Sequence, residues 1–193
     1  MAPRGSQSGA PATALILVDV IESFFTPGMP NNYPEASEVL EPLRRLLASA
    51  RTAGRIVVHA VERHHPGFDD YEWRKLPRHH AIGDPDAAFV DGFSPSGPRE
   101  IVCAKRRYSA FFATDLALFL REQAIDRVVI AGVKTNVCIR ATAQDAFAHG
   151  FDVIVPREAT NSNRPHLAAA SLEDIERYFG AVVTLDRALE MLA

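Results

Sequence analysis

Short apolar runs alternate along this chain with segments whose apolar residues recur at helical spacing, and this alternation constrains the fold more than any other feature. The runs are nearly continuous and rich in β-branched residues, as in strands buried on both faces of a parallel sheet. The pattern therefore predicts an α/β fold with helices on both faces of a mostly parallel sheet. Strands are expected at residues 14–18, 55–61, 100–104, 127–131, 151–155 and 181–184.

The segments between these runs predict the helices. The first predicted helix stops at Gly54, a typical C-cap residue, and Pro42 must lie near its first turn because proline is poorly tolerated in a helix interior. Helical spacing is present at residues 40–50, 116–120, 139–147 and 166–179.

Size and composition indicate one domain. The chain has 193 residues without a break in composition, so residues 14–193 are expected to fold as one unit, and residues 1–13, rich in Ala, Pro, Gly and Ser, as a flexible tail. A net charge of -3 gives no reason to expect nucleic acid or an anionic membrane as a partner. Two cysteines, no long apolar span and no secretory signal favour a cytoplasmic location.

One long segment, residues 62–99, breaks the alternation. It contains five prolines, four histidines and the single tryptophan, with little periodicity. Irregular segments of this length inside a compact domain are usually lids or binding loops, so this segment is expected to cover a site.

Three chemically reactive residues follow predicted strands. Asp19 and Lys105 come directly after the first and third runs, and Cys138 lies one turn beyond the fourth, at the start of a predicted helix. Because ligands bind beyond the carboxyl ends of parallel strands, the three side chains are expected in one pocket. Cys138 is the candidate nucleophile, Lys105 the cation that lowers its pKa, and Asp19 the group that takes the thiol proton and returns it to a leaving amine.

Each of these residues also has an ordinary structural explanation. A cysteine in an Ala-rich helix is more often a small core residue than a nucleophile. An aspartate after a strand is commonly a turn or helix cap, and Lys105 opens a basic run that suits a solvated face. All three residues, however, lie at or just beyond the ends of predicted strands, and this shared position favours the catalytic interpretation. Cys103, inside a predicted strand, is interpreted as a core residue.

Three motifs around the reactive residues resemble the isochorismatase-like cysteine hydrolases. They read ALILVDVIESFF, KRRYSAFFATDL and VVIAGVKTNVCIRATAQDAF, and the similarity covers residues 12–192. The resemblance implies a three-layer α/β/α, Rossmann-like fold with a six-stranded parallel sheet, and a homo-oligomer, either a dimer or a tetramer. It also implies Asp19 as proton shuttle, Lys105 as supporting cation and Cys138 as nucleophile.

The resemblance further implies a cis peptide bond between Val133 and Lys134. This bond would aim the backbone N–H groups of Lys134 and Cys138 into an oxyanion hole. Two departures adjoin the expected pocket: residues 21–23 read Ile-Glu-Ser where the family often has Gln-Asn-Asp, and Lys134 stands where a small or hydroxyl residue is frequent. Because of these departures, the substrate specificity of known family members does not carry over directly to this chain. The three reactive residues are unaffected.

The thiol narrows the reaction that the resemblance implies. Isochorismatases proper cleave a vinyl ether by acid catalysis without a cysteine, so Cys138 indicates hydrolysis of an amide or ureide through a thioester acyl-enzyme. The KRRYSAF and TNVC segments look most like members that act on ureido or N-carbamoyl compounds, the small-molecule substrates expected here. Nicotinamidase-like or other small-amide hydrolysis is the alternative. The candidate substrate-binding residues are the aromatic Phe24, Trp73 and Tyr108 and, for a substrate carboxylate, Arg106, Arg63 and Arg74.

A metal site is not expected from the sequence. Nicotinamidases of this family hold a metal with one Asp and two His after the second strand, but Arg63 stands where the aspartate would be. The remaining ligand-like residues show no recognisable zinc spacing, so the histidines are predicted to be exposed loop residues and no cofactor is predicted. These ligand-like residues are His64, His65, Asp69, Asp70, His79 and His80.

Two other classes of protein stay open. The first is a dinucleotide-binding α/β protein, but DVIESFF follows the first strand in place of G-x-G-x-x-G. The second is a non-catalytic relative that serves as a binding or assembly module. Retention of all three reactive residues counts against it.

Overall fold

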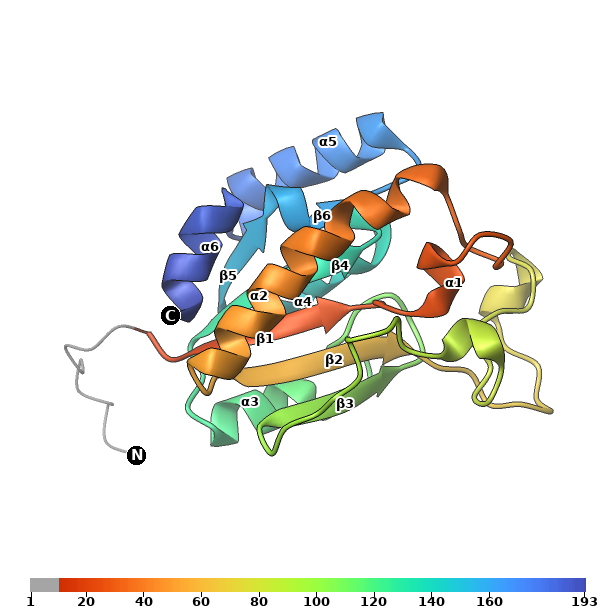
Figure 1. Cartoon of the computed structure of the whole chain (residues 1–193), viewed down its shortest axis with the longest axis horizontal. Helices are drawn as coiled ribbons and strands as arrows, with labels where there is room; N and C mark the ends of the chain where they lie inside the picture. Colours follow the sequence, from red (N-terminus) through yellow and green to blue (C-terminus); the bar gives the residue numbers. More distant parts are fainter. Residues whose placement is uncertain (1–10) are drawn as a thin grey trace.

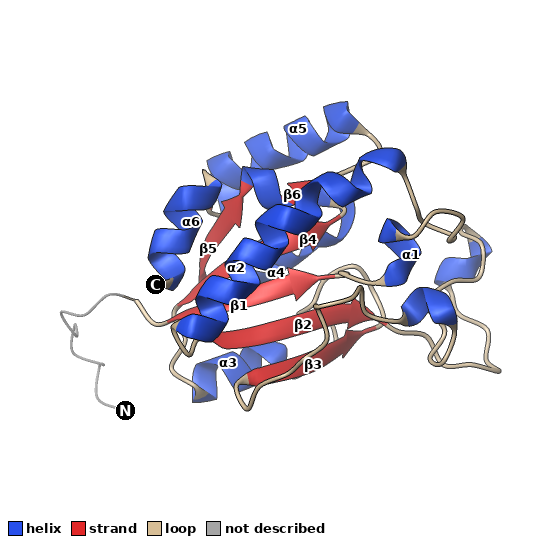
Figure 2. Cartoon of the chain, in the orientation of Figure 1, coloured by secondary structure: helices blue, strands red, loops and turns tan. Residues whose placement is uncertain are grey.

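A computed structural model describes residues 11–193. It contains one parallel sheet in the order β3-β2-β1-β4-β5-β7, with the short β6 paired to β4. Figure 2 shows these strands lying between helices. The strands are β1 (Thr13–Val18), β2 (Ile56–Glu62), β3 (Glu100–Lys105), β4 (Arg127–Val133), β5 (Asp152–Pro156), β6 (Thr160–Asn161) and β7 (Ala181–Val183).

All of the predicted strands are confirmed, with small shifts at their ends. Only β6 was missed, because two residues are too few to carry a periodic pattern. β1 already begins at Thr13, the last residue of the predicted tail. The rest of that prediction, up to residue 10, lies outside the described residues.

The predicted helices are also present, together with two that the spacing did not reveal, α1 and α6. Pro42 lies in the first turn of α2, and Gly54 follows that helix with a φ of +64°, as a glycine after a helix C-terminus commonly does. The helices are α1 (Glu22–Phe25), α2 (Leu40–Thr52), α3 (Leu116–Glu122), α4 (Arg140–Ala148), α5 (Pro165–Asp174) and α6 (Leu185–Leu192).

Two apolar cores, one on each face of the sheet, give the molecule its three layers. Successive side chains of a strand point to opposite faces. Leu15 and Leu17 of β1 accordingly pack in the core that contains α2 and α6, and Ile16 and Val18 pack in the core that contains α3 and α4. Figure 1 shows α2 and α6 in front of the sheet and α3 behind it. The predicted three-layer α/β/α fold is therefore confirmed.

The carboxyl ends of the strands meet at one edge of the sheet, and an irregular cover lies over that edge. Figure 1 shows the strand arrows pointing toward α1 and toward the long segment between β2 and β3. This cover is tied together by its backbone, since the N–H of Glu22 donates to the carbonyl of Ala88 at 2.9 Å and Ile21 forms a bridge with Phe89. Within residues 11–193, no helix has the length and apolar character needed to cross a bilayer.

Candidate active site

Asp19, Lys105 and Cys138 lie together at the covered edge of the sheet. Nζ of Lys105 is 2.8 Å from Oδ2 of Asp19 and 3.7 Å from Sγ of Cys138. The first two residues have no solvent exposure and Cys138 is 4% exposed. The structure thus brings a carboxylate, an ammonium and a thiol into direct contact away from bulk water.

Each of the three side chains is held by the end of a different element. Asp19 follows β1 with a φ of +53°, and its Oδ1 accepts a 2.8 Å hydrogen bond from the backbone N–H of Glu62 at the end of β2. Lys105 is the last residue of β3. Cys138 lies in the helical turn Thr135–Ile139 that leads into α4. The peptide bond between Val133 and Lys134, just before this turn, is cis.

Opposite charges keep Lys105 protonated in spite of its burial. Burial alone would lower the pKa of an ammonium, but the neighbouring carboxylates of Asp19 and Glu62 outweigh that effect and raise the pKa of Lys105. Oε2 of Glu62 lies 3.5 Å from Nζ, so a second carboxylate shares this cation. The site therefore holds a fixed positive charge beside the sulfur.

The thiol of Cys138 behaves differently from the sequence-based expectation. Burial raises its pKa well above the ordinary value, and Lys105 offsets only part of this effect while Asp19 adds to it. The expected fall in the pKa of Cys138 is therefore wrong. A thiol with a raised pKa needs a base to take its proton before the sulfur can attack. Asp19 and Glu62 each place a carboxylate oxygen within 4.8 Å of the sulfur.

A cavity of about 230 Å³ gives access to the sulfur. Phe24 and Tyr108 line it, in agreement with the sequence-based assignment, whereas Trp73 and Arg106 are not among its lining residues. Trp73 instead packs edge-on against His64, with ring centroids 5.3 Å apart, and Arg106 binds Asp70 at 2.7 Å. The cavity is lined by Phe24, Asn31, Glu62, Leu76, His79, His80, Tyr108, Lys134, Val137 and Cys138.

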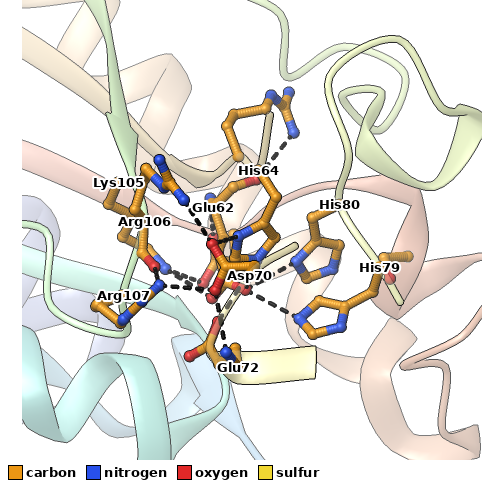
Figure 3. Close-up of polar contacts among 12 residues, drawn as sticks. Glu62, His64, Asp70, Glu72, His79, His80, Lys105, Arg106 and Arg107 are labelled. Atoms are coloured by element: carbon orange, nitrogen blue, oxygen red, sulfur yellow. Dashed lines mark hydrogen bonds and ion pairs between the residues drawn. The ribbon is translucent and has the colours of Figure 1, made fainter. Parts of the chain in front are cut away.

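Three histidines gather around Glu62, next to the cation of the site. Oε1 of Glu62 lies 3.0 Å from Nε2 of His64, 3.1 Å from Nε2 of His79 and 3.3 Å from Nδ1 of His80. Figure 3 shows their rings directed toward this carboxylate. His64, His79 and His80 are 0%, 5% and 1% exposed, so their prediction as exposed loop residues is wrong.

The donor atoms of Glu62, His64, His79 and His80 lie within 4.8 Å of one another, and the hydrogen bond of His79 outside the cluster supports a fit to a metal cation. A neutral imidazole carries one N–H, and Nδ1 of His79 donates its hydrogen to the carbonyl of Pro77 at 2.6 Å. Nδ1 of His64 lies 3.0 Å from Oδ2 of Asp70 but forms no hydrogen bond with it, so it is a buried polar atom without a partner among the described residues. The inner Nε2 of His79 then presents a lone pair to Oε1 of Glu62, which also carries lone pairs, and a cation between these two atoms would remove the repulsion. One carboxylate and imidazole nitrogens suit Zn²⁺.

The sequence analysis missed Glu62, although the signal was present. Glu62 directly follows the apolar run that predicted β2, just as Asp19 and Lys105 follow the first and third runs. The sequence analysis looked for an acidic ligand at position 63, where Arg63 stands, and so overlooked the carboxylate of Glu62 one position earlier. The contribution of His79 and His80 depends on how residues 63–99 fold back over the sheet, and no local pattern encodes that path.

Comparisons with known proteins identify the family of this chain. A model described as the isochorismatase domain matches residues 13–187. The chain belongs to the isochorismatase family. Within it, this chain is 40% identical over 184 residues to maleamate amidohydrolase of Pseudomonas putida, across 93% of this chain and 86% of that protein. It is 30% identical over 186 residues to N-carbamoylsarcosine amidase of an Arthrobacter species, across 93% of this chain and 70% of that protein.

Solved structures of this family have the same fold. An isochorismatase-like hydrolase from Alkaliphilus metalliredigens superposes with a TM-score of 0.85 at 31% identity, covering 94% of this chain and 99% of that chain. A pyrazinamidase from Pyrococcus horikoshii, described as a complex with zinc, superposes with a TM-score of 0.81 at 30% identity, covering 90% of this chain and 99% of that chain. The relatives are named as amidohydrolases and amidases, which confirms the predicted class of hydrolases that act on carbon–nitrogen bonds other than peptide bonds.

Proposed function

We propose that this protein is a cysteine-dependent amidohydrolase that cleaves the C–N bond of a small amide through a thioester acyl-enzyme. One observation carries the proposal: Nζ of Lys105 contacts both Oδ2 of Asp19 at 2.8 Å and Sγ of Cys138 at 3.7 Å, beside a cavity that reaches the sulfur. A buried ammonium in contact with both an acid–base group and a thiol is the arrangement that covalent catalysis by cysteine needs.

The first half of the reaction forms the acyl-enzyme. Asp19 takes the thiol proton while Sγ of Cys138 bonds to the carbonyl carbon of the substrate, and the π electrons of that carbonyl move onto its oxygen. Lys105 stabilises the negative charge that develops near the sulfur. Asp19 then gives its proton to the amide nitrogen, the C–N bond breaks, and ammonia or an amine leaves a thioester on Cys138.

The second half releases the acid. Water attacks the thioester carbon as Asp19 takes one of its protons, and the tetrahedral intermediate then collapses by expelling the sulfur. The sulfur recovers the proton from Asp19, which restores the thiol. The backbone N–H groups of Lys134 and Cys138 would donate to the oxyanion in both halves; the position of Lys134 directly before the turn that contains Cys138 supports this assignment.

The histidine cluster would hold a metal ion at the wall of the same cavity. Its holders would be the side chains of Glu62, His64, His79 and His80, whose donor atoms lie within 4.8 Å of one another. A Zn²⁺ ion bound there would supply Lewis-acid chemistry to a polar group of the substrate. Glu62 joins this cluster to the catalytic residues through its 3.5 Å contact with Lys105.

The substrate is proposed to be a small amide or ureide. Ureido and N-carbamoyl compounds are the class expected from the sequence, and the 40% identity with a maleamate amidohydrolase adds half-amides of dicarboxylic acids to the candidates. The cavity of about 230 Å³ suits a molecule of this size.

Ammonia release from a panel of amides tests the proposal. The panel contains maleamate, ureidoacrylate, N-carbamoylsarcosine and nicotinamide, each assayed with the wild type and with Cys138→Ala. We expect turnover of at least one compound by the wild type and none above background by the variant. Equal ammonia release by the two proteins would show that the thiol is not the nucleophile.

A further inference from the structure

The side chain of Lys134 lines the same cavity as the sulfur of Cys138. Its Nζ lies 5.1 Å from the ring centroid of Tyr33 and 5.7 Å from that of Phe24, and both rings are buried. These aromatic faces hold the ammonium by cation–π attraction and leave it only partly exposed. A lysine held in this way presents its charge to the cavity instead of to bulk water.

Within residues 11–193, Lys134 forms no ion pair with a carboxylate. The two lysine ion pairs found there are both made by Lys105, with Asp19 and Glu62. Burial lowers the pKa of Lys134, and the nearby Arg164, which carries the same charge, lowers it further, against an opposing effect of Cys138. The other charged residue of the cavity wall, Glu62, is already engaged by Lys105 and the histidines. A partly desolvated cation without a counter-ion is stabilised by any anion that enters the cavity.

The arginines that the sequence offered as carboxylate ligands are engaged elsewhere. Arg106 binds Asp70. Arg74 stacks over the ring of Tyr71, with 4.9 Å between its Cζ and the ring centroid, and Arg63 stacks over the ring of Phe89. None of the three lines the cavity. Among the described residues, Lys134 is therefore the lysine or arginine that lines the cavity and can bind an anionic ligand there.

We propose that the Lys134 ammonium binds a carboxylate of the substrate and thereby makes the protein selective for anionic amides over neutral amides of the same shape. The inference rests on the proposed function for the amide itself, which reacts at Cys138. The two residues belong to the same backbone turn and line the same cavity, so a short molecule would present its amide to the sulfur and its carboxylate to Lys134. The alternative role for this side chain is packing on Tyr33 and Phe24 alone.

Equilibrium binding separates these roles without depending on turnover. The background is Cys138→Ser, and the probes are maleamate, which carries one carboxylate and one carboxamide, and maleamide, in which a second carboxamide replaces the carboxylate. Isothermal titration calorimetry then compares Lys134 with Lys134→Met, which keeps an unbranched apolar stem, and with Lys134→Arg, which keeps the charge. Lys75→Met is the matched control, because it makes the same change at an exposed lysine that does not line the cavity.

With Lys134 present, we expect maleamate to bind about 10- to 100-fold more tightly than maleamide, as a charge-assisted hydrogen bond provides. Lys134→Met should bring the two affinities to within about threefold by weakening maleamate alone, while Lys134→Arg and Lys75→Met should keep most of the preference. Unchanged maleamide binding in Lys134→Met shows that the cavity is intact. Retention of the preference by Lys134→Met, or its absence when Lys134 is present, overturns the inference.

Ammonia release by the wild type keeps the two proposals apart. Release at equal efficiency from both amides leaves the amidohydrolase function standing and overturns the role of Lys134. Selective, Lys134-dependent binding of maleamate without any ammonia release from the amide panel supports the carboxylate site and overturns the proposed function.

Discussion

The ammonium of Lys105 has no solvent exposure and contacts Asp19, Glu62 and the sulfur of Cys138. Removing one partner of a buried ion pair leaves the other charge uncompensated. Under the proposed mechanism, both catalysis and stability should therefore change when either member of the pair is altered.

We expect Asp19→Asn and Lys105→Met each to lower kcat by about a hundred- to ten-thousand-fold, since each removes a positioned acid–base or charged group. Each should also lower the free energy of unfolding by about 3 to 5 kcal/mol, because the buried pair is broken. Steady-state kinetics and denaturant unfolding measure the two effects. Cys103→Ala is the control for rate, and Asp19→Asn should add little to the loss caused by Cys138→Ala because the residues act as a unit.

The pH dependence of alkylation tests the electrostatic role of Lys105 directly. Lys105 lowers the pKa of Cys138 against the larger effect of burial, so its removal must raise that pKa further. In a Cys103→Ala background, Lys105→Met should therefore shift iodoacetamide labelling of Cys138 to higher pH. Superimposable labelling profiles would mean that the ammonium does not act on the sulfur.

At the scale of the element, β4 approaches β1 closely at Gly132, shortly before the turn that contains Cys138. Gly132 has a φ of +126°, and a Cβ atom built on it would lie 2.1 Å from the carbonyl oxygen of Val18. A side chain at this position would push β4 away from β1 and from Asp19, which follows Val18. Gly132 thus serves the approach of two strands and also the geometry of the site.

Gly132→Ala should therefore lower the free energy of unfolding by more than about 3 kcal/mol and abolish activity in whatever protein still folds. Gly54→Ala is the matched control, since Gly54 also has a positive φ but open space around its Cα. That variant should lose only about 1 to 2 kcal/mol, the cost of the left-handed conformation itself. Equal losses in thermal or chemical unfolding would show that the contact with Val18 does not matter.

The elements themselves were largely predictable, for a physical reason. Strands such as β1 and β4 are buried on both faces, so each reads as a continuous apolar run, and the residue after each run falls at the edge where ligands bind. This rule located Asp19 and Lys105, and it would have located Glu62 if applied to β2. The short α1 and the two-residue β6 are held by tertiary contacts and carry too few residues for a periodic pattern.

At the scale of the whole molecule, the sequence predicted that residues 62–99 cover a site, but it did not predict the path that this cover takes. Residues 63–99 have little regular structure, and their path brings His79 and His80 to Glu62, 17 and 18 positions earlier in the chain. Burial of the histidines and the exclusion of Trp73 and Arg106 from the cavity both follow from that path. Such contacts depend on which side chains satisfy one another across the fold, and local spacing does not encode them.

The same cover leads to a prediction for metal binding. After treatment with EDTA, addition of Zn²⁺ should raise the unfolding temperature of the wild type, because a ligand that binds only the folded state stabilises it. His64→Ala should lose this response, while His166→Ala, which alters an exposed histidine of α5, should keep it. An unfolding temperature that does not respond to Zn²⁺ in the wild type would exclude the cluster as a zinc site.

The central claim is that Cys138 carries the acyl group during turnover, and peptide mass spectrometry after a rapid acid quench tests it most directly. During turnover of an amide from which the wild type releases ammonia, we predict that the peptide containing Cys138 gains the mass of the acyl group, while the peptide containing Cys103 stays unmodified. Hydroxylamine should remove the added mass, as expected for a thioester. Steady release of ammonia by a protein whose Cys138 never carries that mass would contradict the account.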